Sequence, residues 1–268
     1  GRRSAPSQSP ASGIACYYYQ SIASILYNRY PPMSEQKPRS VDAALKSPLI
    51  SQRTVKVIAY SLLVLCLSAY TWKEHLEDRL IPKRWGVVEA GSIYRSGQLH
   101  PALIERVLIE HDIGVIVDLN GKRIGKVEHE TEDEVAMNLG IDKKRYPLNG
   151  NGTGNIEQYA QAIAAINKAV KEKQPVLVHC SAGSQRTGGV IAMYRLLVQK
   201  QSVLPILEEM EQYDWDSEDD QVLSIYLDKN ITILAERLVS LSVIEAVPSH
   251  LPSFVANVEA RDLESATR

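Results

Sequence analysis

The sequence feature that most constrains the fold is a short apolar strand followed at once by a loop and a helix. Residues 176–180 read VLVHC and lead into SAGSQR, after which a pattern typical of a helix begins at Thr187. A strand that is apolar throughout, without alternation, is buried on both faces, as in a parallel sheet covered by helices. The rest of the chain must therefore supply further strands and the helices that cover them.

An alternation of strand and helix patterns fills residues 85–242. Further strands are expected at Ser92–Arg95, Val115–Leu119 and Arg145–Leu148. Helices are expected at Pro101–His111, Lys126–Leu139, Ile156–Lys173 with Asn155 as N-cap, Thr187–Gln199, Ser202–Tyr213 and Asp219–Ser242. The alternation predicts an α/β domain with a central, mostly parallel sheet flanked by helices. Residues 243–268 carry Pro248 and Pro252 before a polar run and are expected to form a C-terminal tail.

The first 53 residues have a different composition. They are rich in Ser, Pro, Ala and Arg and show no sustained period of 2 or 3.6, which predicts a disordered leader. The first residue is Gly, and Met33 opens the polar stretch MSEQKPRS. We therefore expect translation to begin at Met33 and residues 1–32 not to be native.

Residues 54–72, TVKVIAYSLLVLCLSAYTW, are the only candidate for a membrane helix. Their single charge, Lys56, lies near one end, and Tyr60, Tyr70 and Trp72 are suited to a membrane interface. A buried core helix or a signal sequence is the alternative, because the uncharged run falls short of about 20 residues. We expect a single-pass anchor at the membrane, with its orientation open because basic residues flank both ends.

Composition excludes several classes of function. The chain has 30 Lys and Arg against 32 Asp and Glu, so it lacks the basic excess that binding to nucleic acid usually needs. Its three cysteines, Cys16, Cys66 and Cys180, are far apart and never form a C-x-x-C pair. This spacing argues against a disulfide framework and against a cysteine zinc site. A functional cysteine must act alone.

The segment from His179 to Gly188 has the form H-C-x-x-G-x-x-R-[ST]-G. Cys180 lies where a strand meets a helix N-terminus, so loop amides and the helix dipole lower the pKa of its thiol and favour the nucleophilic thiolate. Arg186 returns to the same loop, where its planar guanidinium can hold two phosphate oxygens. Gly183 allows the tight curve and a close approach of the backbone to the ligand. The pattern predicts a nucleophile within a site for a phosphate dianion.

The loop as a whole is expected to bind the phosphate of a substrate. Its members are Ser181, Ala182, Gly183, Ser184, Gln185 and Arg186. For Ser184 and Gln185, a solvated side chain is as plausible as contact with the substrate. Thr187 can donate its hydroxyl to the thiolate, and His179 is expected to orient the loop rather than touch substrate. Cys180 could also be an inert buried residue, but Arg186 and the following helix start argue against this.

This segment resembles the signature of the cysteine-dependent protein tyrosine phosphatase superfamily. The resemblance covers residues 85–227, and its size is similar to that of the dual-specificity branch. GSIYRSGQ, which includes Arg95 and Ser96, and GVIVDLN are also similar to compact dual-specificity phosphatases. The resemblance implies that Cys180 attacks phosphorus, that Arg186 stabilises the transferring phosphoryl group, and that water hydrolyses the intermediate. It implies no metal and no organic cofactor.

One departure from the family concerns the general acid. The family has an Asp on a loop roughly thirty residues before the cysteine, and here residues 147–155 read PLNGNGTGN, with Asn149 and Asn151 in the expected place. An amide cannot donate the proton. Asp118, at the carboxyl end of its strand, is the better-placed acid, although a structural role is equally plausible, and Glu157 is a further option. Aryl phosphates should then be hydrolysed better than alkyl phosphates.

Three functions remain in competition at this point. The first is a membrane-anchored phosphatase that acts on phosphotyrosine, phosphoserine or phosphothreonine in proteins. The second is a phosphatase for phosphoinositides or small phosphoesters, which the absence of Lys from positions 181–185 disfavours. The third is a phosphate-binding pseudophosphatase, supported by the missing loop Asp and opposed by the intact Cys180 and Arg186. A sulfur-transferring rhodanese also uses a cysteine loop, but the R-T-G ending favours phosphate chemistry.

Overall fold

The structure is a computed structural model that describes residues 51–122, 124–217 and 219–266. The chain divides into two units, residues 1–65 and residues 66–268. Of the expected leader, residues 1–53, the first 50 residues lie outside the described part of the chain. The start proposed at Met33 lies among them.

The second unit is built on a five-stranded sheet with the order β1-β2-β5-β3-β4. The strands are β1 (Gly86–Glu89), β2 (Ile93–Ser96), β3 (Val115–Asp118), β4 (Asp142–Arg145) and β5 (Val176–His179). Only the β1–β2 pair is antiparallel among these strands, and the other three pairs are parallel. The expected mostly parallel α/β sheet is confirmed.

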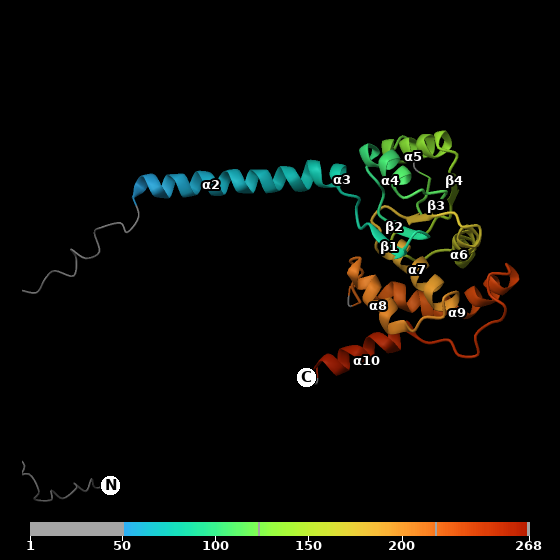
Figure 1. Cartoon of the computed structure of the whole chain (residues 1–268). Coiled ribbons are helices and arrows are strands. Elements are labelled where there is room, and N and C mark those ends of the chain that lie inside the picture. The colour runs from blue at the N-terminus through green and yellow to red at the C-terminus, as the bar shows by residue number, and fades with distance from the viewer. Residues whose placement is uncertain (1–50, 123, 218, 267–268) are drawn as a thin grey trace, which may run out of the picture. The chain divides into compact units, whose positions relative to one another are not determined.

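Helices cover both faces of this sheet (Figure 1). On one face lie α4 (Pro101–Glu110) and α5 (Val127–Asn138), and on the other α6 (Ile156–Lys171), α7 (Gln185–Leu197), α8 (Val203–Gln212) and α9 (Gln221–Ser240). Each face has its own apolar cluster: Ile116 and Leu177 point to the α4–α5 side, whereas Val117 and Val178 point to the other. Successive side chains alternate between the two faces, so all four residues of β3 and of β5 are buried, including Asp118 and His179 at their carboxyl ends.

The parallel register brings the carboxyl ends of three strands to one edge of the sheet. Ser96 of β2 and Asp118 of β3 both pair with His179 of β5. The segments that follow these strands, beginning at Gly97, Leu119 and Cys180, therefore meet above the same edge.

Two strand predictions need correction. β4 covers Asp142–Arg145 and therefore begins three residues before the start of the predicted strand at Arg145–Leu148. These charged residues form an edge strand, where Lys143 and Arg145 pair with buried carboxylates instead of packing in an apolar core. β1 was not predicted, because its four residues pair only with β2 and carry one exposed valine, Val87.

The expected C-terminal tail at residues 243–268 is wrong for half of its length. Residues Phe254–Ala266 form helix α10, and the Phe254 side chain is fully buried against the core of α8 and α9. Asp228 of α9 caps this helix, since its carboxylate accepts hydrogen bonds from the Ser253 hydroxyl and from the backbone N–H groups of Phe254 and Val255. The apolar residues Phe254, Val255 and Val258 stand in an otherwise polar run, a signal too weak to predict packing.

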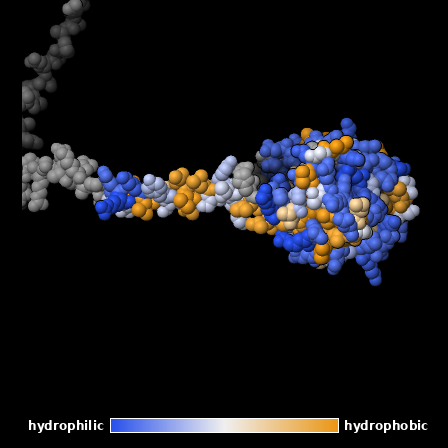
Figure 2. Space-filling view, turned by 90° about the horizontal axis from the view of Figure 1, so that it is seen from above, coloured by the Kyte–Doolittle hydropathy of each residue, from blue (hydrophilic) through white to orange (hydrophobic). Residues whose placement is uncertain are grey.

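The apolar segment at residues 54–72 is a helix, α2, with bounds Gln52–Thr71. It is followed by a short π-helix (Trp72–Leu76) and by α3 (Glu77–Leu80). Its mean hydropathy in the most apolar window is 1.6, and its side chains are exposed within the described structure (Figure 2). By length and composition alone, this helix could cross a membrane.

Candidate active site

Cys180 follows β5 directly and lies beneath the N-terminus of α7, with 1% of its surface exposed. Its sulfur accepts a hydrogen bond from the Gly183 backbone N–H at 3.1 Å. Burial opposes ionisation of the thiol, but the positive charge of Arg186, the Thr187 hydroxyl and the backbone N–H groups outweigh it, so the pKa of Cys180 is lowered. The geometry favours a thiolate at the base of the loop.

Gly183 lets this loop close on the neighbouring strand end. Its φ of +86° is in the region that favours glycine, and a Cβ atom there would lie 2.6 Å from the Gly97 nitrogen. Two arginines brace the loop from below: Arg95 donates to the Gly183 carbonyl and Arg84 to the Ala182 carbonyl, both at 2.9 Å. Arg95 is fully buried and stacks over the Tyr213 ring, which fixes the position of its guanidinium.

Arg186 lies in the first turn of α7 with only 8% of its surface exposed. Its Nη1 donates to the Asn120 side-chain oxygen at 2.9 Å, whereas its buried Nε has no partner among the described residues. A buried donor left unpaired is costly unless a ligand meets it. The guanidinium is therefore held on one side and free to bind an anion on the other.

The remaining side chains of the loop are tied to the protein. Ser181 donates to the Asn120 side-chain oxygen at 2.7 Å, Ser184 to the Asp214 carbonyl at 2.8 Å, and Gln185 to the Asp220 carboxylate at 2.9 Å. The side chains of Ser184 and Gln185 therefore stabilise the loop, and neither role foreseen for them, solvation or substrate contact, describes these bonds. The first-turn N–H groups of α7 have no acceptor within the helix and can face a phosphate.

His179, just before the cysteine, belongs to a buried group of charges. Its Nε2 lies 3.2 Å from Glu132 Oε1 and 3.9 Å from Asp118 Oδ1. Burial opposes its protonation, but Glu132 and Asp118 raise the pKa of His179 to about 9. Burial likewise works against ionisation of Glu132, yet His179 and Lys143 lower the pKa of that carboxyl to about 2. These shifts favour a charged pair of His179 and Glu132, and the role of His179 in orienting the loop stays a prediction.

The carboxylates of Asp118 and Glu132 lie with His179 in a group close enough to hold a metal ion. Lysine and arginine side chains already form ion pairs with these two carboxylates. Lys143 Nζ lies 2.6 Å from Glu132 Oε1, and Arg145 Nε lies 2.7 Å from Asp118 Oδ2. The group is best described as an ion-pair network below the loop, in which the edge strand β4 supplies the cations.

The geometry of Asp118 favours a structural role over that of a general acid. Its side chain is fully buried, its Oδ2 accepts from Arg145, and its Oδ1 accepts from the Asn120 backbone N–H at 2.8 Å. A carboxylate fixed in this way supports Asn120, which in turn holds Arg186. Its assignment as the acid stays a prediction that these contacts do not favour.

The other candidates for the acid are no better placed. Residues 149–155 lie beside the loop, because a Cβ atom on Gly152 would be 3.2 Å from the Gln185 carbonyl oxygen. The side chains of Asn149 and Asn151, however, form hydrogen bonds with Thr153 in the same segment. Glu157 is paired with Arg237 at 2.7 Å, and hydrogen bonding from Arg237 lowers the pKa of Glu157.

Sequence reasoning missed Asn120 and Glu132. Asn120 lies in GVIVDLN, two residues after Asp118, and its position at the carboxyl edge of β3 was the one available signal. Glu132 lies in the acidic run EHETEDE, which predicts a solvated helix face, yet it is only 2% exposed.

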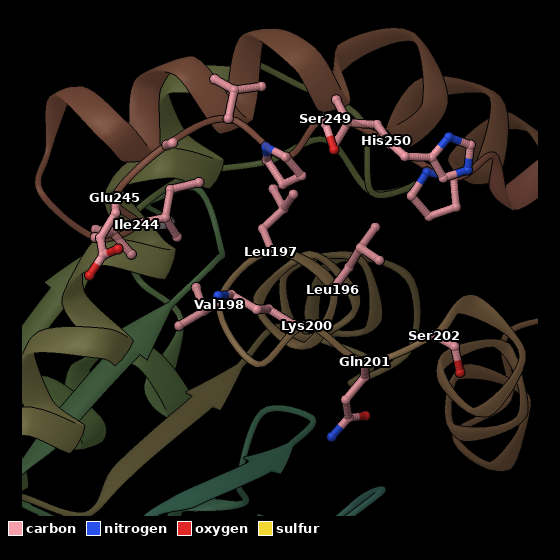
Figure 3. Close-up of a pocket in the computed structure, with 16 residues that line it drawn as sticks. Leu196, Leu197, Val198, Lys200, Gln201, Ser202, Ile244, Glu245, Ser249 and His250 are labelled. Atoms are coloured by element: carbon pink, nitrogen blue, oxygen red, sulfur yellow. The ribbon is translucent and has the colours of Figure 1, made fainter.

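A hollow of about 770 Å³ lies away from the loop, between the end of α7 and residues 243–252 (Figure 3). Leu196, Leu197 and Val198 line one wall, with Ser249 and His250 on the opposite segment. None of the residues 179–187 lines it, so this hollow is separate from the cysteine loop.

The sequence around this loop is similar to that of known phosphatases. A family model described as a polymorphic toxin system DSP-PTPase phosphatase matches residues 95–200. The dual specificity protein phosphatase TpbA of Pseudomonas aeruginosa UCBPP-PA14 is 43% identical over 53 residues, or 20% of this chain and 24% of that protein. The dual specificity protein phosphatase OPG106 of vaccinia virus Western Reserve is 27% identical over 123 residues, or 42% of this chain and 71% of that protein. The chain thus spans about a quarter of the length of TpbA.

Solved structures of similar fold include those of P. aeruginosa TpbA and of the catalytic core of the PP-IP phosphatase SIW14 from S. cerevisiae. The TpbA structure is 19% identical, with a TM-score of 0.47 over 60% of this chain and 91% of that one. The SIW14 structure is 22% identical, with a TM-score of 0.48 over 61% of this chain and 94% of that one.

Proposed function

Because this chain belongs to the cysteine-dependent protein tyrosine phosphatase superfamily and is dual-specificity-like, we propose that it hydrolyses phosphate monoesters through a cysteinyl-phosphate intermediate. The observation that best supports the proposal is the joint placement of a Cys180 thiol with a lowered pKa and an Arg186 Nε that no described residue binds. The first group supplies the nucleophile, and the second supplies a donor for phosphoryl oxygens.

Two steps follow from this arrangement. In the first, the Cys180 sulfur attacks phosphorus, so that an S–P bond forms while the P–O bond to the leaving group breaks and its electron pair stays on that oxygen. Arg186 and the loop N–H groups hold the phosphoryl oxygens. In the second, water attacks phosphorus, the S–P bond breaks, and phosphate and the Cys180 thiolate are released. The Thr187 hydroxyl stabilises the departing thiolate.

The leaving oxygen also needs a proton, and residues 149–155 offer no carboxylic acid for this step. We propose that an aryl oxygen, which is a stable anion, leaves without general acid help. General acid catalysis typically contributes about 10² to 10⁴ in rate, so alkyl phosphates should be turned over more slowly by a factor of that order.

Two substrate classes fit the proposed chemistry. Phosphotyrosine, phosphoserine or phosphothreonine in proteins is the first, supported by the names of TpbA and OPG106 as dual specificity protein phosphatases. Phosphoinositides or other small phosphoesters are the second, supported by a cavity beside Ser181. We further propose that α2 anchors the chain in a membrane as a single-pass helix, supported by its length, hydropathy and exposed apolar side chains.

The direct test is hydrolysis of an aryl phosphate and an alkyl phosphate by the full chain and by Cys180→Ser. We expect turnover of the aryl phosphate that is abolished by Cys180→Ser. If a folded protein binds vanadate without any turnover, the proposed hydrolysis fails and a phosphate-binding pseudophosphatase takes its place. Equal rates for both esters, with the basic limb of the pH profile lost in Asp118→Asn, would restore Asp118 as the general acid.

A further inference from the structure

A second cavity of about 250 Å³ lies beside the phosphate loop, and Ser181 lines it. Its other walls come from the segment after α3 and from the N-terminal ends of α4 and α5, including His100, Lys126 and His129. Because Ser181 also belongs to the loop that would hold the scissile phosphate, a ligand that fills the cavity lies next to that phosphate.

One wall of this cavity carries a buried polar atom without a partner. His129, in the first turn of α5, is only 7% exposed, and its Nδ1 has no hydrogen-bond partner among the described residues. Leaving such a buried atom unpaired is costly. A polar group of a ligand in the cavity would satisfy it.

A second imidazole presents a donor to the same cavity. His100 caps α4, with its Nδ1 accepting a hydrogen bond from the Ala102 backbone N–H at 3.1 Å. An imidazole whose Nδ1 accepts carries its hydrogen on Nε2. His100 therefore has an N–H donor left for a ligand.

The helix ends add donors of their own. α5 begins after Lys126, whose side chain makes no capping hydrogen bond, so the first N–H groups of this helix need an acceptor. The dipoles of α4 and α5 both favour an anion at these ends. Lys83 and Lys126 also line the cavity, together with the oppositely charged Asp78 and Glu128. Binding of an anion therefore draws on the N–H donors and on Lys126 together.

We propose that this cavity is a second phosphate subsite, so that the substrate of the Cys180 site is a small bisphosphate. One phosphate lies in the loop of residues 181–186, and the other contacts His129, His100 and Lys126. The inference rests on the proposed phosphatase activity and chooses between its two substrate classes. A compact cavity that adjoins the loop, and that is lined by His129 with its unpaired imidazole nitrogen, suits a second phosphate a few bonds away better than a flexible peptide side chain.

Binding to the full-length Cys180→Ser protein tests the subsite independently of turnover. Alkanediol bisphosphates of two to four carbons are compared by calorimetry with the monophosphates of the same diols. We expect the best bisphosphate to bind about tenfold more tightly or better, the equivalent of one charge-assisted hydrogen bond. Adding Lys126→Ser should reduce this ratio of dissociation constants towards one. The matched control is Lys122→Ser, because Lys122 is also exposed but does not line the cavity, and it should keep the ratio.

The outcomes separate the subsite from the phosphatase activity. Equal affinity for bisphosphates and monophosphates, with aryl phosphate turnover intact in the unmodified chain, overturns the subsite alone. Loss of turnover and of all phosphate binding overturns both proposals. Tighter binding of a phosphopeptide with a neighbouring acidic residue than of any bisphosphate contradicts the small-molecule substrate.

Vesicles that contain a lipid with two headgroup phosphates form a last arm of the comparison. Tighter binding to these vesicles than to soluble bisphosphates identifies a lipid source, and the reverse identifies a free metabolite. Either result supports the subsite, provided that Lys126→Ser weakens the binding and Lys122→Ser does not.

Discussion

A single amide, that of Asn120, joins the groups that would face a phosphate. Its oxygen accepts from Arg186 and from Ser181, and its backbone N–H is held by Asp118. Its Nδ2 lies 3.3 Å from the Gln98 side-chain oxygen, and Gln98 in turn donates to Glu132 at 2.7 Å. The position of the Arg186 guanidinium thus depends on a buried chain of hydrogen bonds below it.

We predict that Asn120→Ala lowers kcat for an aryl phosphate by about 10- to 100-fold, because one hydrogen bond to a charged group is lost. Asn120 touches no substrate, so its effect should act through the position of Arg186. Vanadate affinity should fall in parallel, and the pH at which the Cys180 thiolate forms should change little. Asn138→Ala, on the exposed end of α5, is the matched control. Unchanged kcat in Asn120→Ala would show that Arg186 needs no support.

At the scale of elements, β5 and α5 are joined by the ion pair between His179 and Glu132. The folded pKa of His179 is raised from 6.5 to about 9, so the stability that this pair supplies is present below pH 6.5 and lost as the pH rises through 9. The folded pKa of Glu132 is lowered from 4.5 to about 2, so its contribution is present above pH 4.5 and lost as the pH falls through 2.

We therefore predict that the melting temperature falls between pH 6.5 and 9 more steeply in the unmodified chain than in His179→Asn. The measurement is thermal unfolding followed by circular dichroism across this range. His250→Asn is the control, since His250 is exposed and lies in the segment before α10. Parallel pH profiles for the unmodified chain and His179→Asn would contradict the ion pair.

Helix α10 gives a second test at this scale. Phe254 is fully buried, whereas Leu263 of the same helix is 69% exposed. We predict that Phe254→Ala lowers the free energy of unfolding by about 3–5 kcal/mol, as expected for a buried aromatic side chain, while Leu263→Ala changes it by less than about 0.5 kcal/mol. Denaturant unfolding measures both values. Similar small effects for the two substitutions would mean that residues 254–266 are a tail after all.

Part of the fold and of the candidate site could be predicted from the sequence. The apolar runs of β3 and β5 and the N-cap Asn155 were sufficient to predict the sheet and α6, because burial and capping act locally. β4 could not be located, because its charged residues are stabilised by Glu132 and Asp118, which are distant in sequence. The loop around Cys180 was predictable as a contiguous motif, whereas Asn120 joins it only through the register of β3 beside β5.

At the scale of the whole molecule, α2 is the element that would decide where the proposed phosphatase works. The helix has no buried residue, and Leu62, Leu63, Val64 and Leu65 in its middle are each more than half exposed. We predict that Leu63→Arg moves the full chain from the membrane to the soluble fraction of cells, because a charge at the centre of a span costs about 2.5–3.5 kcal/mol. Lys56→Arg, which keeps the existing charge near the helix end, is the control. Retention of Leu63→Arg in the membrane fraction would contradict anchoring by α2.

Trapping the intermediate tests directly whether Cys180 carries the phosphoryl group. The full chain is mixed with an aryl phosphate, quenched in acid within the first turnover, and digested for mass spectrometry. We expect that the peptide containing Cys180 gains the mass of one phosphoryl group, and that this modified peptide is absent from Cys180→Ser. Release of phosphate in the burst phase with an unmodified Cys180 peptide, or with the phosphoryl group on another residue, would contradict it.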